Sequence, residues 1–441
     1  MEQSGGEKPS GEAAGEDRLS ALPDDALVLI LLRLGDTAAP RRTSVLSRRW
    51  RRVWTLLPRL RFRATGEPQL VLVAAALAAH EAAIRHLAVE TLDAAAAPVS
   101  ALLNAAAGRI SGRLVFRNRV AGAWRRRNNA AAAAADDDDD DDGSDDDDEV
   151  VVVAGGGGAG AVELPCLENA TAVSLDVGFL LGLAVPAAGV FARLTEISIA
   201  RVRFHGPSDL GDAVSSPRCP SLEKLSILDT MGMADLTIRS DTLLKLVLEQ
   251  VHELRRLAVA APKLRELKLS RILVRDNQLS ADISAPNLIL LEWRIGYDPS
   301  SIQLGKMEQL QWLLPKHFRV YGAPDSRSNL DTLGLLKRFK VVDTLMVSLL
   351  YPEDLDESQY LMEEVTMLPH VTFLILKTVN YGHSFGASSF HVLRLCTGIR
   401  RLVLQLHTCS DLEAQECPLG CICGQSTDWK TEEISLTAFN Q

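Results

Sequence analysis

The chain has 441 residues, of which 47% are hydrophobic and 24% charged, a composition that favours a folded globular protein over a fibrous or wholly disordered one. Its net charge of −10 is concentrated in residues 136–149, which hold twelve acidic side chains; the other 47 basic and 45 acidic residues nearly balance. Charge alone therefore gives no indication of nucleic-acid binding.

No apolar run reaches the roughly 18 to 20 residues of a membrane span. Residues 1–17 are polar and lack the apolar core of a secretory signal, so we expect them to form a disordered tail. These features predict no membrane partner, a location in the cytoplasm and/or nucleus, and reduced thiols on the seven cysteines.

Two short helices are predicted between residues 22 and 54. The pair Asp24-Asp25 suits the first turn of a helix, where negative charge is stabilised, and residues 35–37 break that helix. The second helix carries Trp50 and Trp54 on one face because they are four residues apart. A helix pair of this size cannot bury a core of its own, so it must pack on the rest of the chain or on a partner.

This stretch resembles an F-box of the plant type, and we assign residues 18–62 to it. The residues that carry the resemblance are Leu22-Pro23-Asp24-Asp25, Ile30-Leu31, Arg42-Thr43-Ser44-Val45-Leu46-Ser47-Arg48-Arg49-Trp50, Trp54 and Leu57-Pro58-Arg59-Leu60-Arg61-Phe62. In that family the F-box docks on a Skp-type adaptor, which holds a cullin and a RING protein.

The resemblance implies a set of adaptor-binding residues: Leu22, Pro23, Ile30, Leu31, Val45, Leu46, Ser47 and Trp50. Pro40 departs from the family's pattern and is expected to shorten the second helix without abolishing docking. The alternative is an ordinary N-terminal helical hairpin that packs only on its own chain.

Residues 63–128 are predicted to hold a linker helix and the first leucine-rich repeats. Gly66 to Ala79 is Ala/Leu-rich, and Ile84-x-x-Leu87-x-Val89 and Leu114-Val115-Phe116 follow it. Residues 129–163 are low in complexity, acidic and then Gly-rich, and predict a disordered insert because like charges at that density repel. Arg125-Arg126-Arg127 beside it is either a nuclear signal or a solvated basic patch.

A repeated pattern, L-x-x-L-x-L, organises residues 164–408. The cassettes begin at Ala170, Leu194, Leu222, Leu243, Leu264, Leu288, Val342, Val371 and Ile399. Steps of 21 to 29 residues between most neighbours are those of leucine-rich repeats. Each cassette is a short strand with one buried face, so stacked repeats predict an α/β fold: an irregular solenoid with a parallel sheet on its concave face.

The array is irregular in two ways. The Asn or Cys that usually follows the cassette is replaced by other residues, such as Val202 and Thr230, and one repeat is blurred. Residues 310–321 are predicted to supply that repeat. The alternative to a solenoid is an ordinary α/β domain with Leu-rich strands.

The cassettes also predict which side chains face outward. The middle repeats present charges such as Lys268 and Glu292, whereas the C-terminal repeats present Met346, Phe373, Ile375 and Val403. Neighbouring parallel strands lie about 4.8 Å apart, so these four apolar side chains should form one patch. We assign it as the target-binding surface; the alternative is that residues 351–360 or the C-terminal tail cover it.

Residues 409–441 resemble part of the FBD motif of plant F-box proteins, in which a Cys-rich turn and a Trp precede a final strand; here the motif looks cut short. Cys409, Cys417, Cys421 and Cys423 lie within fifteen residues, but C-x₃-C-x-C is an uncommon zinc spacing. Cys421 and Cys423 would also point apart on a strand. We therefore expect no metal ligand.

No phosphate-binding loop, G-x-S-x-G or H-E-x-x-H motif occurs, so we expect no enzyme, no catalytic residue and no cofactor. The resemblance implies a substrate-recognition subunit of an SCF-type E3 ubiquitin ligase, with the repeats binding an unknown target protein. One alternative is a scaffold that binds the adaptor without promoting ubiquitylation. Another is a hydrolase or nucleotide-binding protein on a repeat scaffold, against which the missing motifs count.

Overall fold

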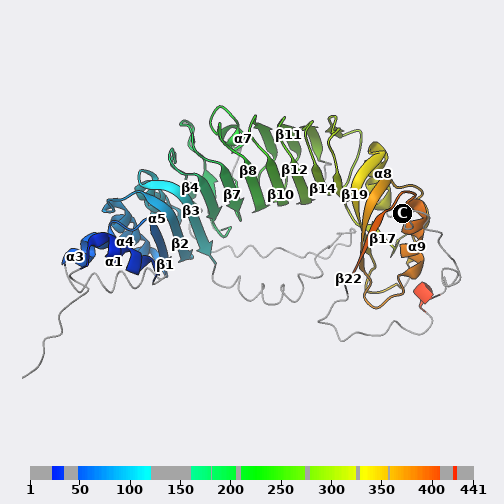
Figure 1. Cartoon of the computed structure of the whole chain (residues 1–441), viewed down its shortest axis with the longest axis horizontal. Coiled ribbons are helices and arrows are strands. Elements are labelled where there is room, and N and C mark those ends of the chain that lie inside the picture. The colour runs from blue at the N-terminus through cyan, green and yellow to red at the C-terminus, as the bar shows by residue number, and fades with distance from the viewer. Residues whose placement is uncertain are drawn as a thin grey trace, which may run out of the picture.

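The chain forms an arc of stacked coils, with the N-terminal helices at one end and the last repeats at the other (Figure 1). This computed structural model describes residues 22–33, 48–120, 160–179, 181–204, 210–273, 279–323, 328–355, 358–407 and 421–424, without the side chains of residues 48, 50, 51 and 328. No helix within these ranges is both long and apolar enough to cross a membrane.

One sheet of fourteen strands lines the concave side of the arc, and all of its strand pairs are parallel. In spatial order its strands are β1 (Arg59–Ala64), β2 (Ile84–Leu92), β3 (Ile110–Arg119), β5 (Ala172–Asp176), β7 (Glu196–Ala200), β8 (Lys224–Thr230), β10 (Lys245–His252), β12 (Glu266–Leu273), β14 (Leu290–Arg294), β16 (Trp312–Pro315), β19 (Val341–Leu350), β21 (His370–Val379) and β22 (Arg401–His407), with β17 (Phe318–Arg319) also beside β19.

The convex side changes along the arc. Helices cover the two ends: α4 (Glu67–Ala78) and α5 (Ala96–Ala107) near the N-terminus, and α8 (Ser328–Arg338) and α9 (Gly386–Leu395) near the other end. Between them lie the short helix α7 (Leu210–Val214) and a second parallel sheet of β9 (Asp235–Arg239), β11 (Arg256–Ala260), β13 (Ser280–Ser284) and β15 (Ile302–Leu304). The middle repeats therefore return to the concave sheet through strands rather than helices.

The remaining elements are short or lie at the N-terminal end. They are α1 (Asp24–Arg33), α3 (Arg48–Trp54), the strand pairs β4 (Ala161–Glu163) with β6 (Gly182–Ala184) and β18 (Tyr321–Gly322) with β20 (Gln359–Tyr360), and the 3-10 turns η1 (Met362–Glu364) and η2 (Ile422–Gly424). The predicted helix at Gly66 to Ala79 is confirmed as α4, for which these two residues are the caps. The break after the first helix and the start of the second, with Pro40, lie outside the described residues.

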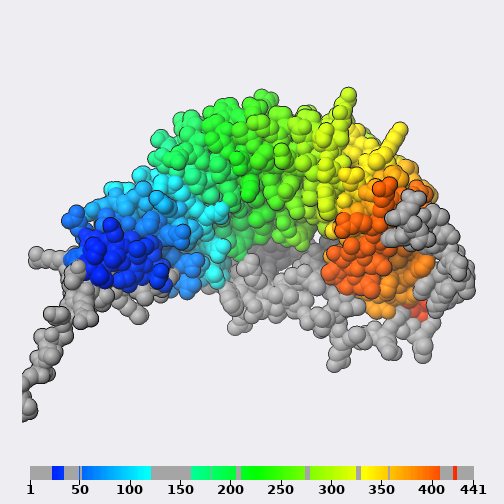
Figure 2. Space-filling view, in the orientation of Figure 1, coloured from blue at the N-terminus to red at the C-terminus, as the bar shows by residue number. Residues whose placement is uncertain are grey.

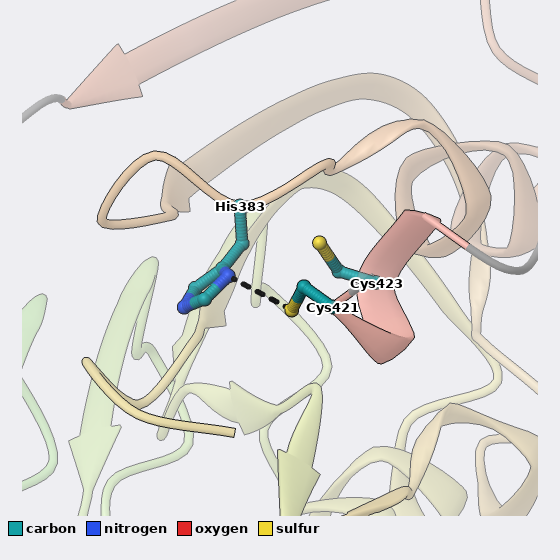
Figure 3. A group of neighbouring side chains, drawn as sticks. All are labelled: His383, Cys421 and Cys423. Carbon is teal, nitrogen blue, oxygen red and sulfur yellow. Dashed lines mark hydrogen bonds between the residues drawn. The ribbon is translucent and has the colours of Figure 1, made fainter. Parts of the chain in front are cut away.

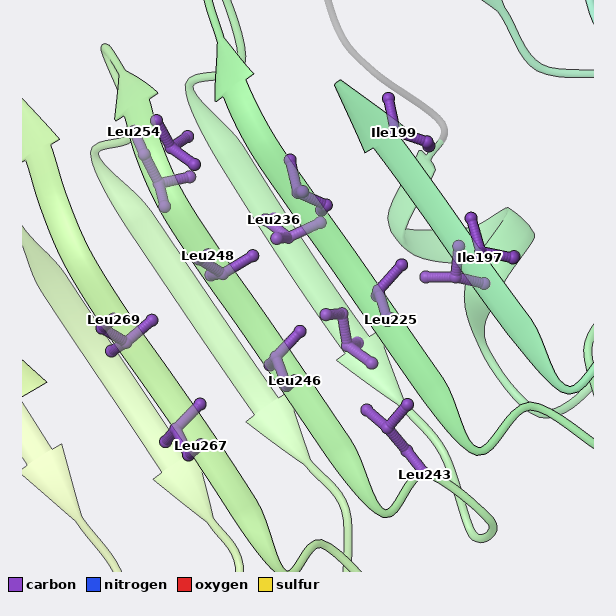
Figure 4. Close-up of a cluster of buried hydrophobic side chains, with 14 of the residues drawn as sticks. Ile197, Ile199, Leu225, Leu236, Leu243, Leu246, Leu248, Leu254, Leu267 and Leu269 are labelled. Atoms are coloured by element: carbon purple, nitrogen blue, oxygen red, sulfur yellow. The ribbon is translucent and has the colours of Figure 1, made fainter. Parts of the chain in front are cut away.

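The predicted cassettes pair in register along the whole sheet. Leu246 on β10 lies in register between Leu225 on β8 and Leu267 on β12, and each of the three is fully buried. Figure 4 shows these side chains stacking from coil to coil between the concave strands and the strands behind them. As predicted, residues 310–321 supply the blurred repeat, through strand β16. The repeats share one continuous core, which favours the leucine-rich-repeat solenoid over the alternative of an ordinary α/β domain.

The irregular repeats share a backbone kink that the sequence did not reveal. Arg201, Asp229, Gln250 and Arg271 each lie two residues after the last apolar position of their cassette, and each has φ between 51° and 52°. The pairing of β8 with β10 skips both Asp229 and Gln250, which occupy the same place on the two strands, so the strands kink together and keep their register. Two of these residues also join neighbouring coils: Arg201 pairs with Asp176, and Arg271 with Glu249 at 2.7 Å.

Candidate interaction surfaces

The N-terminal helices α1 and α3 pack on each other and on the first coil. Leu27 and Leu31, four residues apart on α1, are buried in the core. Arg49 of α3 reaches back to α1, where its guanidinium lies 2.8 Å from the Asp24 carboxylate and also donates to the Leu22 carbonyl. The acidic first turn that the sequence indicates thus also anchors the second helix.

The implied adaptor-binding residues are only partly described. Pro23 is exposed, Leu22 and Ile30 are half-buried, and Leu31 is buried at 4% exposure. Val45, Leu46 and Ser47 lie outside the described residues, as does the side chain of Trp50. The adaptor-binding assignment therefore stays a prediction, and Leu31 contributes to internal packing in this structure.

Leu29 is an exposed apolar residue on α1 that is absent from the set implied by the family resemblance. Its side chain is 62% exposed, on the side of the helix away from Leu27 and Leu31. Helical periodicity could have found it, because inward residues at positions 27 and 31 place position 29 outward. Leu29 with Leu22, Pro23 and Ile30 forms what we call the α1 surface.

A buried histidine joins the helix pair to the repeats. The ring of Trp54 lies edge-on to His80 at 5.8 Å and to Phe62 of β1 at 6.3 Å. His80 is fully buried, and its Nε2 lies 3.0 Å from the Leu57 carbonyl. A carbonyl only accepts, so Nε2 carries the proton, and burial lowers the pKa of His80.

The concave face changes in character along the sheet, beginning with a basic end on β1 to β3. Its side chains are Arg59, Arg61, Arg63, His86, Arg113, Arg117 and Arg119. Among them the carboxylate of Glu90 lies 3.5 to 3.8 Å from Arg63, Arg117 and Arg119. Burial, together with the neighbouring arginines, lowers the pKa of His86. This cationic end suits an acidic partner. The sequence shows the arginines around the Leu114-Val115-Phe116 cassette, but it did not predict that they share a face with those of β1.

The middle repeats carry the predicted charges as ion pairs across neighbouring strands. Lys245 pairs with Glu266 at 2.8 Å, and Glu292 lies 3.1 Å from Lys268 and 2.7 Å from Arg294. Burial alone would raise the pKa of Glu292, but its two cationic partners bring it below its ordinary value. These charges are therefore largely satisfied within the chain.

The predicted apolar patch lies at the other end of the concave face. Met346, Ile375 and Val403 are neighbours in register on β19, β21 and β22. Ile375 is 9% exposed and forms the floor of the patch, whereas Val403 is 38% exposed at its edge. The structure thus brings together the residues that the repeat spacing predicts. Their assignment as a target-binding surface stays a prediction.

Trp312 belongs to the same patch and was missed because it lies in the blurred repeat. The Trp312 ring lies edge-on to the Phe373 ring, with 6.3 Å between the ring centroids. The Arg401 guanidinium lies over the Phe373 ring, 4.7 Å from its centroid. We call Trp312, Met346, Phe373, Ile375 and Val403 the C-terminal apolar patch. Two large rings beside aliphatic side chains are typical of protein contact sites.

The alternative cover for this patch is described only in part. Tyr351 is buried in the core, and the ring of Tyr360 packs on that of Tyr321 at 5.4 Å. Residues 408–420 and 425–441 lie outside the described part of the chain.

The prediction that Cys421 and Cys423 lie on a strand and point apart is wrong. Cys421 directly precedes the 3-10 turn η2, which contains Cys423. A tight turn brings both sulfurs to the same side, and with Nδ1 of His383 all three atoms lie within 4.8 Å of one another (Figure 3). Among the described residues, this is the group of side chains that could hold a metal ion.

These features define a class of protein: a leucine-rich-repeat solenoid, curved into an arc, with a helical N-terminal segment (Figure 2). A family model described as FBD-associated F-box protein At5g56370, LRR repeats, matches residues 162–306. No solved structure matches the chain.

The chain is also similar to curated plant proteins. It is 31% identical over 128 residues to the F-box/FBD/LRR-repeat protein At4g03220 of Arabidopsis thaliana, covering 29% of this chain and 26% of that protein. It is 47% identical over 57 residues to the F-box/FBD/LRR-repeat protein At2g04230 of the same plant, covering 13% and 12%. The chain thus matches about a quarter or less of the length of these relatives. Together the matches confirm the resemblance to plant F-box/FBD/LRR-repeat proteins.

Proposed function

We propose that this chain is the target-recognition subunit of an SCF-type E3 ubiquitin ligase. Its N-terminal helices bind a Skp-type adaptor, which brings a cullin-RING core, and the concave face of its repeats binds a target protein. The support is the F-box in the names of its relatives together with the exposed α1 surface at one end of an open repeat arc.

In this proposal the chain contributes position rather than chemistry. A target held against the repeats and a ligase core held at α1 become parts of one complex, so ubiquitin transfer gains from proximity and orientation. The chain itself is not an enzyme and acts in the cytoplasm or nucleus.

The target is proposed to contact the C-terminal apolar patch. Aromatic side chains that lose their water on binding are typical energetic centres of interfaces, and the edge-on pair of Phe373 and Trp312, which is 37% exposed, offers two such rings. The basic end of the same face then guides acidic surfaces of the target during association.

The adaptor assignment is tested by capture of the intact chain with a purified plant Skp-type adaptor. The wild-type chain should bind, and a Leu22→Ala, Pro23→Ala double variant should bind more weakly. Leu273→Ala is the matched control, because Leu273 is also exposed but lies at the end of β12, in the middle of the solenoid. Absence of binding by a folded wild-type chain would refute the proposal.

A second assay separates ubiquitin ligation from simple scaffolding. The complex assembled with a cullin-RING core should transfer ubiquitin to a protein captured by the repeats. Stable capture without transfer would favour a scaffold that binds the adaptor but does not promote ubiquitylation.

A further inference from the structure

A histidine and two cysteines from distant parts of the chain meet beyond the last strands of the solenoid. His383 lies in the turn between β21 and α9, and Cys421 is 38 residues further along the chain. Figure 3 shows the imidazole and both thiols pointing into one shared space. From this arrangement we propose that His383, Cys421 and Cys423 bind a zinc ion.

The distances suit a tetrahedral zinc site. Zinc bonds of about 2.3 Å to sulfur and about 2.0 Å to nitrogen place neighbouring S and N ligands about 3.5 Å apart at a tetrahedral angle. Nδ1 of His383 lies 3.7 Å from Sγ of Cys421. The remaining ligand pair separations are at most 4.8 Å, so side-chain rotation of about 1 Å closes the set.

The imidazole is already oriented as a metal ligand. Its Nε2 lies 3.1 Å from the Glu353 carbonyl, which can only accept a hydrogen bond, so Nε2 bears the proton and the lone pair of Nδ1 faces the thiols. A carbonyl partner on the far nitrogen is the usual support of a zinc-bound histidine. The ring is also stacked on Tyr351 at 6.3 Å, and the backbone carbonyl of His383 accepts a 2.7 Å hydrogen bond from Asn380.

The sulfur atoms have a matching environment. Sγ of Cys423 accepts a hydrogen bond from the Ser384 backbone N–H at 3.4 Å, an interaction that stabilises a metal-bound thiolate. Cys423 and His383 are both almost fully buried, whereas Cys421 is half-buried and gives an ion access from solvent. Two thiols and one imidazole are soft and borderline donors, the set that selects zinc over magnesium or calcium.

Binding would fasten the chain after β22 to the turn after β21. The closed loop contains α9 and the edge strand β22, whose Leu404 and Leu406 are 54% and 55% exposed. A closed loop has less conformational freedom when unfolded, and metal-binding free energy adds to folding free energy. The ion thus stabilises the end of the solenoid that carries the C-terminal apolar patch.

The test uses the full chain, prepared under reducing conditions and freed of metal with a chelator. Co²⁺, added alone, should produce a thiolate-to-cobalt charge-transfer band that saturates at one equivalent, and Zn²⁺ should displace it. The Cys421→Ser, Cys423→Ser double variant should lose the band, while the control variant Cys166→Ser should keep it. Cys166 is half-buried like Cys421 but lies in an earlier repeat.

A thermal melt gives a second readout that does not depend on the variants. Zn²⁺ should raise the melting temperature of the wild-type chain, because an ion that binds only the folded state stabilises it. Three results would overturn the proposal: no charge-transfer band in the wild-type chain at excess Co²⁺, a band retained by the double variant, or a disulfide between Cys421 and Cys423 that persists under reducing conditions.

Discussion

Leu27 and Leu29 of α1 offer a matched pair that separates folding from adaptor binding. They are chemically identical and two residues apart, yet Leu27 is fully buried and Leu29 is 62% exposed. Leu27→Ala should lower the free energy of unfolding by about 2 to 5 kcal/mol, as expected for a buried leucine. Leu29→Ala should change stability by less than about 0.5 kcal/mol, because it removes few internal contacts.

The expected loss of adaptor affinity follows from the exposed fraction of Leu29. Truncation to alanine removes three carbons, worth about 2.4 kcal/mol when fully transferred from water. Only the 62% now in water can gain from burial at an interface, which leaves about 1.5 kcal/mol, or a tenfold weaker Kd. Titration calorimetry with a Skp-type adaptor, beside a thermal melt of each variant, measures both quantities.

Unchanged affinity in a folded Leu29→Ala chain would refute the reasoning that α1 presents an adaptor-binding surface. It would favour the alternative in which the N-terminal helices pack only on their own chain. An equal fall in stability for both variants would contradict the burial pattern itself.

Three further predictions follow from the same structure. Leu246→Ala should lower the free energy of unfolding by about 2 to 5 kcal/mol in urea, and Val247→Ala by about 1 kcal/mol or less, because Leu246 is buried in the core whereas Val247 is half-buried on the concave side; equal losses would contradict the register. Phe373→Asp should abolish target capture while leaving adaptor binding intact, as measured by pull-down of each partner. Since the pKa of His80 lies below its ordinary 6.5 in the folded chain, the unfolded chain binds more protons in acid, so stability should fall as the pH drops below about 6.5. His80→Gln should lessen that fall in melts at about pH 7.5 and 5.5, and an identical pH profile would exclude His80 as its source.

The repeat architecture could be predicted because the L-x-x-L-x-L pattern recurs many times along the chain. Each cassette puts two apolar residues at alternating positions, and a register error would expose every one of them, so spacing alone fixes the neighbours. Leu225, Leu246 and Leu267 therefore lie side by side as expected. The same logic placed Met346, Ile375 and Val403 together.

Three features could not be predicted from the sequence. They depend on contacts between segments that are distant in the chain, or on backbone turns that no particular residue type marks. The basic end of the concave face joins arginines of β1 and β3 with His86 of β2, and it forms only because these three strands lie side by side. The turns at Asp229 and Gln250 have positive φ without glycine, so composition gives no hint of them. The two cysteines are a further case: a strand would separate the side chains of Cys421 and Cys423, whereas the 3-10 turn brings both to His383, which lies 38 residues before Cys421 in the chain.

The arc also determines how its two ends influence each other. In a solenoid each coil contacts only its neighbours, so stability and perturbation spread mainly through adjacent interfaces. The N-terminal helix pair packs on the first coil through Trp54 of α3 and His80, whereas the C-terminal apolar patch lies on β16 to β22, separated from it by the intervening coils. A substitution at one end should therefore leave binding at the other unchanged unless it unfolds a coil between them. In the function proposed above, this separation lets the α1 surface hold the adaptor while the C-terminal apolar patch holds the target.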